Sequence, residues 1–331
     1  MKRVPTHYLN SFVTFAEAHG ASRPELLKEA AVPQATLDDP EARIEYEQFK
    51  LLIRGAVARS GNPALGIRLA GQLPITTHGL LGYAAMSSET LEEALSFVTR
   101  FVPTRVPMLV AELSVDKGVA TLRIEEAAVL GEVRATILET TVGALHATAR
   151  FLTQGEFELE ELRFPYEEPD YVEEYRSAFG CPLSFGAEAT EMRFAAGLLK
   201  TRLPLADEAA KKLAAKRCEE ELAAIESNDD LEQRIRVQLL KMGRLHPNLY
   251  PLAKTLGLSP RTVRRRLRNA GTSYKAILHS VREELAVQYL RTTHWTIYQI
   301  ADRLGYNDQS NFGRAFKSWT GQSPQEFRDA Q

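Results

Sequence analysis

Cysteine is scarce in this sequence. Only Cys181 and Cys218 occur among the 331 residues, and neither belongs to a C-x-x-C pair or has a histidine at metal-ligand spacing beside it. This excludes a disulfide framework and the common zinc modules, and it suits a reducing compartment. We therefore expect no metal and no cofactor. Two inert thiols are the simpler interpretation of the pair, with a redox switch as the alternative.

Long hydrophobic runs are also missing. No stretch approaches about 18 consecutive apolar residues, the length that a membrane-spanning helix needs. After Lys2 and Arg3 the chain continues with polar and aromatic residues instead of the apolar core of a signal peptide. We expect a cytoplasmic protein that makes no contact with a membrane.

Common catalytic motifs are absent from the first two thirds of the chain. Residues 1–228 contain no G-x-S-x-G, H-E-x-x-H, P-loop or G-x-G-x-x-G sequence. The sequence therefore argues against an enzyme, including one whose catalytic part is fused to a C-terminal domain of another function. Turnover by the N-terminal part alone would revive that alternative.

Charge is distributed unevenly along the chain. The formal net charge is −2, but residues 229–331 hold 17 Lys and Arg against 9 Asp and Glu, a net charge of +8. Residues 1–228 hold 24 against 34, a net charge of −10. Such a split favours attraction of phosphate by the C-terminal part alone.

Residues 249–270 have the pattern of two helices joined by a tight turn. An apolar stripe at helical spacing ends at Gly257, a residue suited to ending a helix. Ser259 and Pro260 then provide a cap and a first position for the next helix. The apolar stripe of the first helix consists of Leu249, Leu252, Ala253 and Leu256.

The second helix of this pair has an apolar side and a cationic side. At about 100° per residue, Val263, Leu267 and Ala270 share one face. Guanidinium groups pair with guanine edges or with phosphates, so the opposite face predicts DNA binding, with an ordinary solvated surface as the alternative. The candidate DNA-binding residues on it are Arg261, Arg264, Arg265 and Arg268.

The same arrangement returns about 48 residues later. Thr296 and Gln299 form a T-x-x-Q capping box, and Gly305 supplies the turn. The apolar stripe is Ile297, Ile300, Ala301 and Leu304, and the inward face of the following helix is Phe312, Ala315, Phe316 and Trp319.

The outer side of that last helix carries the second group of candidate DNA-binding residues. Gly313 in the middle of a helix costs roughly 1 kcal/mol relative to Ala, which suits a surface that approaches DNA closely, although a neutral accident is equally open. The candidates are Gln309, Ser310, Asn311, Gly313, Arg314 and Lys317.

The C-terminal hundred residues resemble the AraC/XylS family of transcription regulators. The resemblance depends on Ile300-Ala301, Gly305-Tyr306, Ser310, Phe312, Arg314, Phe316-Lys317, Gly321, Ser323-Pro324 and Phe327-Arg328, and between the two pairs of helices on Gly271, Ser273-Tyr274, Arg282, Ala286 and Leu290. It implies an all-α domain with two tandem helix-turn-helix units. One departure is the high arginine content of the first recognition helix, so its base preference cannot be transferred from relatives.

The resemblance also implies roles and partners. By position, Arg261, Arg264 and Arg265 match base-reading and phosphate-contacting sites of the first unit, and Gln309, Ser310, Gly313 and Arg314 match those of the second. A helix over 273–290, about 26 Å long, would hold the two recognition helices near one DNA turn apart. The implied partners are double-stranded promoter or operator DNA and RNA polymerase, with activation as the usual output and repression also open.

Residues 1–204 predict a mixed α/β sensor or dimerisation domain. We expect helices over 5–19, 25–30, 41–60, 64–69, 90–102, 132–152 and 169–179, and strands over 108–115, 119–124, 159–164 and 192–194. The first two of these strands would be joined by a tight turn at Asp116-Lys117-Gly118, a hairpin signal. Residues 79–86 form an apolar, glycine-containing segment.

This N-terminal part resembles the arabinose-binding-like domain of the AraC branch that includes ornithine-utilisation regulators. The motifs are Asp39 to Ile44, Gly79 to Tyr83, Phe164-Pro165, Tyr175, Phe179 to Pro182 and Phe185-Gly186. The resemblance implies a small-molecule effector of unknown identity, while a domain that only oligomerises or binds a protein is the alternative. Polar residues near apolar stretches that could line a pocket are His78, Tyr83, Arg105, Arg123 and His146.

Residues 205–228 predict a joining helix, before a DNA-binding domain over 229–331. Its apolar side would be Ala206, Ala210, Leu213, Ala214 and Leu222. In relatives a helix here commonly lies at a dimer interface, so a homodimer interface and packing on the sensor domain are both open. Residues 227–230 break the pattern and would cap a helix over 231–242.

Overall fold

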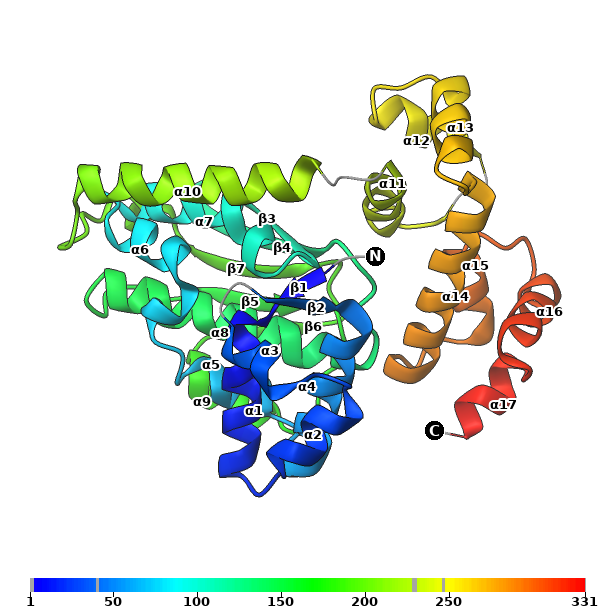
Figure 1. Cartoon of the computed structure of the whole chain (residues 1–331), viewed down its shortest axis with the longest axis horizontal. Helices are drawn as coiled ribbons and strands as arrows, with labels where there is room; N and C mark the ends of the chain where they lie inside the picture. The colour runs from blue at the N-terminus through cyan, green and yellow to red at the C-terminus, as the bar shows by residue number, and fades with distance from the viewer. Residues whose placement is uncertain (1–2, 40–41, 228–230, 246–247, 331) are drawn as a thin grey trace. The chain divides into compact units, whose positions relative to one another are not determined.

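The computed structural model describes residues 3–39, 42–227, 231–245 and 248–330. The chain divides into two compact units (Figure 1). Unit 1 comprises residues 1–125 and 133–225, and unit 2 comprises residues 126–132 and 226–331. The chain therefore passes between the units three times. Asn228–Asp230, part of the predicted break after the joining helix, lie outside the described residues.

Unit 1 contains a five-stranded sheet in the order β3-β4-β7-β5-β6. Antiparallel pairs join β4 to β7 and β7 to β5, whereas β5 and β6 run parallel. Alternate residues of β4 are buried, which is the period of two expected for a sheet covered on one face. The strands are β3 (Leu109–Asp116), β4 (Val119–Glu126), β5 (Glu161–Phe164), β6 (Leu183–Phe185) and β7 (Thr190–Ala195).

Most helices of unit 1 lie where the sequence predicted them, but the short helix over Gln34–Asp38 was not predicted. Hydrophobic side chains at helical spacing are buried, as in α1, where Leu9, Phe12 and Val13 are at most 3% exposed. The α-helices are α1 (Leu9–Ala18), α2 (Arg23–Glu29), α3 (Gln34–Asp38), α4 (Tyr46–Ser60), α5 (Leu65–Ala70), α6 (Leu80–Met86), α7 (Leu91–Arg105), α8 (Arg134–Leu152), α9 (Val172–Phe179) and α10 (Glu208–Ser227), with 3-10 turns η1 (Thr6–Tyr8), η2 (Ile75–His78), η3 (Gly131–Val133) and η4 (Ala196–Lys200).

Three short strands of unit 1 were not predicted. β1 (Arg3–Pro5) and β2 (Arg43–Glu45) form a separate two-stranded antiparallel sheet, so the helices predicted over 5–19 and 41–60 begin later than expected. Glu45 stays extended because it caps α4 in a capping box with Gln48. The third strand, β6, lies in a stretch for which the sequence predicted no element.

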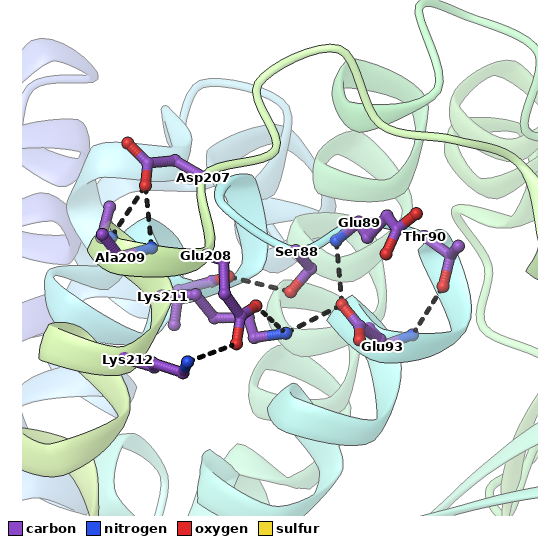
Figure 2. A network of polar contacts seen from close by, with 11 residues as sticks. Ser88, Glu89, Thr90, Glu93, Asp207, Glu208, Ala209, Lys211 and Lys212 are labelled. Carbon is purple, nitrogen blue, oxygen red and sulfur yellow. Dashed lines mark hydrogen bonds and ion pairs between the residues drawn. The ribbon is translucent and has the colours of Figure 1, made fainter.

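The predicted apolar side of the joining helix α10 is only in part the side that packs on unit 1, where Ala210 and Leu222 are half-buried. Ala214 and Cys218 are buried, whereas Leu213 is 70% exposed and Ala206 precedes the helix. Ion pairs join α10 to α7: Lys211 to Glu93 at 3.0 Å, Glu219 to Arg100 at 2.7 Å and Glu221 to Arg105 at 2.8 Å. The first turn is capped by Asp207, which accepts hydrogen bonds from the N–H groups of Ala209 (Figure 2) and Ala210.

Unit 2 is all-helical around one hydrophobic core. The largest fully buried side chains of this core are Phe312 and Phe316. Its helices are α11 (Leu231–Leu240), α12 (Leu249–Thr255), α13 (Pro260–Asn269), α14 (Tyr274–Thr292), α15 (Ile297–Arg303), α16 (Gln309–Thr320) and α17 (Pro324–Asp329). The fold class is therefore a mixed α/β N-terminal part and an all-α C-terminal part, as predicted.

Residues 126–132, which connect β4 to α8, form part of unit 2. Val129 is 7% exposed and belongs to the unit 2 core. The Gly131 N–H donates to Gln288 Oε1 at 2.7 Å, and Gln233 Nε2 donates to the Ala127 carbonyl at 3.2 Å. Arg291 also forms an ion pair with Glu132. A segment from the N-terminal half is thus built into the C-terminal unit.

Candidate nucleic-acid interface and apolar cavity

The first helix-turn-helix is built by local signals in the sequence. α12 is followed by Gly257, whose φ of +66° is the left-handed conformation that glycine adopts readily. Ser259 Oγ then accepts from the Thr262 N–H at 3.1 Å, and Pro260 is the first residue of α13. Val263 and Leu267 are buried. These contacts set the angle at which α13 leaves the turn.

The outer face of α13 is a continuous cationic surface, which we call the arginine face. All of its arginines are exposed, and none makes an ion pair with another described residue. Arg266 also belongs to it, although the helical spacing did not predict this. Ala270, predicted on the apolar side, is exposed because α13 ends at Asn269 and Ala270 is its C-cap. The arginine face consists of Arg261, Arg264, Arg265, Arg266 and Arg268.

The second helix-turn-helix has the predicted capping box. Thr296 Oγ1 accepts from the Gln299 N–H at 3.2 Å, and Gln299 Oε1 accepts from the Thr296 N–H at 2.7 Å. Asp308 caps α16 by accepting from the Asn311 N–H at 2.7 Å. Trp319, predicted in the core, is only half-buried, with its ring edge-on to His279 at 5.6 Å.

The candidate residues of α16 lie together on its outer side. Gly313 is half-buried, and a Cβ built on it would meet nothing within 4 Å. Arg314 Nη2 donates to Asn311 Oδ1 at 2.7 Å, and Asn311 also bonds to Asp308. This chain of contacts orients the Arg314 guanidinium. The exposed members of the set are Gln309, Ser310, Asn311, Arg314 and Lys317.

Arg282 of α14 holds the second turn in place. Its Nε donates to the Leu304 carbonyl at 2.8 Å, its Nη2 donates to the Gly305 carbonyl at 3.1 Å, and its guanidinium lies 4.6 Å from the centre of the Tyr306 ring. Burial lowers the pKa of Arg282. From the sequence, Arg282 was identified only by its match to the family pattern. Its hydrogen bonds to main-chain carbonyls explain why an arginine, with several N–H donors, occupies this position.

Unit 1 contains an apolar cavity of about 90 Å³. Its walls come from β1, α1, α4, α6, α7 and α8, and hydrophobic side chains form most of them. Of the five residues suggested as pocket-lining, His78 and Arg105 line it. The Tyr8 hydroxyl lies 2.8 Å from His78 Nδ1 inside the same cavity.

The other three suggested residues lie elsewhere in unit 1. Tyr83 is 56% exposed. Arg123 pairs with Glu125 at 2.9 Å and with Glu191 at 2.7 Å on the sheet. His146 is buried beside aromatic rings, and desolvation, assisted by the charge of Arg150, lowers its pKa to about 4.

The two cysteines are free thiols. Burial raises the pKa of both Cys181 and Cys218 to about 11, which keeps them in the less reactive thiol form at neutral pH. In the part of the chain that the structure describes, no group of three or more His, Cys, Asp or Glu side chains could hold a metal ion. Nor does any helix of that part have the length and apolarity for crossing a bilayer.

Comparison with known proteins identifies both units. The arabinose-binding N-terminal domain of AraC transcription regulators matches residues 20–203, and a helix-turn-helix domain matches residues 252–330. The ornithine utilization regulator of Pseudomonas aeruginosa is 34% identical over 99% of this chain and 96% of its own length.

Two further relatives cover different extents of the chain. The urease operon transcriptional activator of Escherichia coli is 33% identical over 24% of this chain and 27% of its own length. The crystal structure of the transcriptional regulator CdpR from Pseudomonas aeruginosa aligns with 92% of this chain and 96% of that chain, at 24% identity and a TM-score of 0.44. The extent of the domain matches, together with the ornithine utilization relative, shows that this chain belongs to the AraC family of DNA-binding transcriptional regulators, which is not an enzyme family.

Proposed function

We propose that this regulator activates transcription by binding two successive major grooves through α13 and α16 under the control of a small-molecule effector in unit 1. The observation that carries the DNA assignment is the arginine face, which is exposed and makes no ion pair with other described residues. Activation is supported by the name of the Escherichia coli relative. The apolar cavity supports effector binding.

The length of α14 supports contact of the two helix-turn-helix units with one face of a DNA duplex. α14 has 19 residues, which corresponds to about 28 Å at 1.5 Å per residue. Successive major grooves on one face recur after about 34 Å. A rigid helix of this length therefore suits one protein chain that contacts two grooves.

We propose a functional division into residues 1–204 for regulation, 205–228 as the joining helix and 229–331 for DNA binding, with residues 126–132 as a part of the regulatory sequence that packs in unit 2. The proposed DNA contacts are Arg261, Arg264, Arg265, Arg268, Gln309, Ser310, Asn311, Gly313, Arg314 and Lys317. The protein would act in the cytoplasm.

Replacing Arg265 or Arg314 by alanine should weaken binding to the specific site by about 1–3 kcal/mol, or roughly 5- to 150-fold, if each arginine makes a bidentate base contact. Binding would be measured on a site found by selection of genomic fragments and by footprinting, at several salt concentrations. Protection of two adjacent major grooves per chain is expected.

The matched control is Arg217→Ala, which removes one positive charge from the exposed side of α10. It should leave the affinity for the specific site unchanged. Equal losses on specific and random DNA would instead assign Arg265 or Arg314 to phosphate contacts. Footprints covering a single groove would contradict the tandem arrangement.

The proposed protein partners are RNA polymerase and a second copy of this chain. Leu213, which is 70% exposed on α10, supports a homodimer, because burying a large apolar side chain in an interface is energetically favourable. The same residue favours the second candidate function, a unit 1 that only oligomerises. The dimer is tested by light scattering, which compares the molar mass of Leu213→Glu in solution with that of the wild type. Transcription with purified RNA polymerase, with and without metabolites, separates the two functions.

A further inference from the structure

The walls of the cavity in unit 1 restrict the ligands that can enter it. No Asp or Glu lines it, so a ligand ammonium group would be buried without a counter-charge. The hydroxyls of Thr140 and Thr141 donate to main-chain carbonyls of α8 at 2.7 and 2.8 Å. A ligand rich in hydroxyls would therefore meet mostly apolar walls.

Arg105 is the one permanently charged residue of this lining. Its side chain is only 10% exposed. Nε donates to the His78 carbonyl at 3.3 Å, and Nη1 and Nη2 donate to Glu221 at 2.8 and 3.5 Å. A guanidinium has five N–H donors, so these three contacts leave donors for a further acceptor.

We propose that the cavity binds a small apolar monocarboxylate whose carboxylate pairs with Arg105 in competition with Glu221 of α10. This inference rests on the proposed effector function of unit 1. A guanidinium pairs with a carboxylate through two parallel hydrogen bonds, and the apolar walls take the hydrocarbon part. At roughly 10–15 Å³ for each water-sized group, the cavity of about 90 Å³ admits a compact acid rather than a long chain.

Through the competition with Glu221, binding of the ligand affects how α10 is held. Two carboxylates at one guanidinium repel each other, so the ligand weakens the Glu221 contact. The beginning of α10 stays attached, because Lys211 pairs with both Glu93 and Glu208 at 3.0 Å and Asp207 caps the helix (Figure 2). The ligand therefore loosens the last turns of α10, where the chain enters unit 2 at Glu226.

A second connection begins at the same cavity. Ile137, Thr140 and Thr141 of α8 line its wall. α8 starts at Arg134, directly after residues 126–132, which belong to unit 2. The proposed ligand thus touches one of the elements through which the chain passes to unit 2 and displaces the partner of another.

The test uses the full-length protein with hexanoate and benzoate, and with hexanamide, benzamide, hexylamine and ornithine as probes of other charge. Calorimetric titration and the melting temperature are measured for each. We expect binding of at least one acid, with its amide, hexylamine and the amino acid ornithine, whose ammonium groups would find no counter-charge, at least tenfold weaker. Equal binding of the acid and its amide, or binding of neither acid, would overturn the carboxylate assignment.

Three variants connect the binding to the named groups. Glu221→Gln removes the competing charge and should tighten acid binding by about tenfold, whereas Arg105→Gln should abolish it. Glu219→Gln, which removes an exposed carboxylate of the same helix that pairs with Arg100, is the matched control and should change nothing. Equal effects of Glu221→Gln and Glu219→Gln would overturn the competition, even if Arg105→Gln failed to fold.

Measurement of DNA affinity separates the two proposals. A DNA affinity that responds to an amine or to a neutral metabolite, with no response to the acids, overturns the carboxylate inference and leaves effector sensing standing. If no compound of a broad metabolite set alters DNA affinity or the melting temperature, effector sensing itself fails.

Discussion

Gly305→Ala should destabilise unit 2 by about 3–5 kcal/mol, a large part of the stability of a domain of this size. A Cβ on Gly305 would lie 1.7 Å from the Leu245 carbonyl oxygen, far inside contact distance. The φ of +75° adds the strain of a left-handed conformation. Neither Leu245, which donates its N–H to the Arg303 carbonyl, nor the turn that Arg282 holds has freedom to move aside.

Tryptophan fluorescence measures this loss selectively, because the two tryptophans of the chain, Trp295 and Trp319, both lie in unit 2. Urea unfolding followed by fluorescence should show the midpoint of the variant at a much lower concentration than that of the wild type. An unchanged midpoint would mean that α15 and the 245 region are not packed as described.

Two other glycines provide graded controls. Gly257→Ala occupies the equivalent turn, with φ of +66° but no atom within 4 Å of the new Cβ, so only the strain of about 1–2 kcal/mol is expected. Gly313→Ala in α16 also meets nothing, and should stabilise the helix by up to about 1 kcal/mol. A loss of DNA affinity in Gly313→Ala alone would support close approach of that surface to DNA.

The helix-turn-helix units were predictable because their signals are local. Capping residues, glycine turns and apolar stripes act within a few positions of the chain, and the predicted capping box at Thr296 is present. The arginine face follows from the same periodicity. Arg266 was missed because the predicted face was drawn too narrowly for an exposed helix.

Features that depend on distant contacts were not predictable. β1 and β2 pair across about 40 residues, and nothing local marks them as strands. On α10 the buried face was predicted from the apolar residues alone. In the structure Lys211 and Glu221 also face unit 1, where they form ion pairs with residues of α7. The cavity is likewise assembled from elements distant in sequence, so Tyr8 and Arg105 meet only in the fold.

The second large effect concerns Glu139, a carboxyl buried in the core of unit 1. It is 0% exposed, and its Oε1 accepts from the Tyr171 hydroxyl at 2.8 Å and from the Tyr175 hydroxyl at 2.5 Å. Its Oε2 has no hydrogen-bond partner among the described residues. Desolvation raises the pKa of Glu139 to about 7, although the two tyrosine hydrogen bonds act in the opposite direction.

This raised pKa makes unit 1 less stable as the pH rises. The unfolded chain loses the Glu139 proton near the ordinary value of 4.5, and the folded chain loses it near 7. Between these values the folded state binds more protons, so its stability falls with increasing pH, and above about pH 7 the favourable contribution is lost. At about 1.4 kcal/mol for each pH unit, the total change is about 3 kcal/mol.

Glu139→Gln should therefore gain stability relative to the wild type by about 2.5 kcal/mol between pH 5 and pH 8. The glutamine carbonyl still accepts from Tyr171 and Tyr175, and burial raises the pKa of both phenols, so that they remain donors over this range. Calorimetry at several pH values, with fluorescence to identify the unit 2 transition, measures the difference. Glu156→Gln, at an exposed position of unit 1, is the control. A constant difference between wild type and Glu139→Gln from pH 5 to pH 8 would show that Glu139 ionises alike in the folded and unfolded chains, and that its burial is relieved by water or by movement of α9.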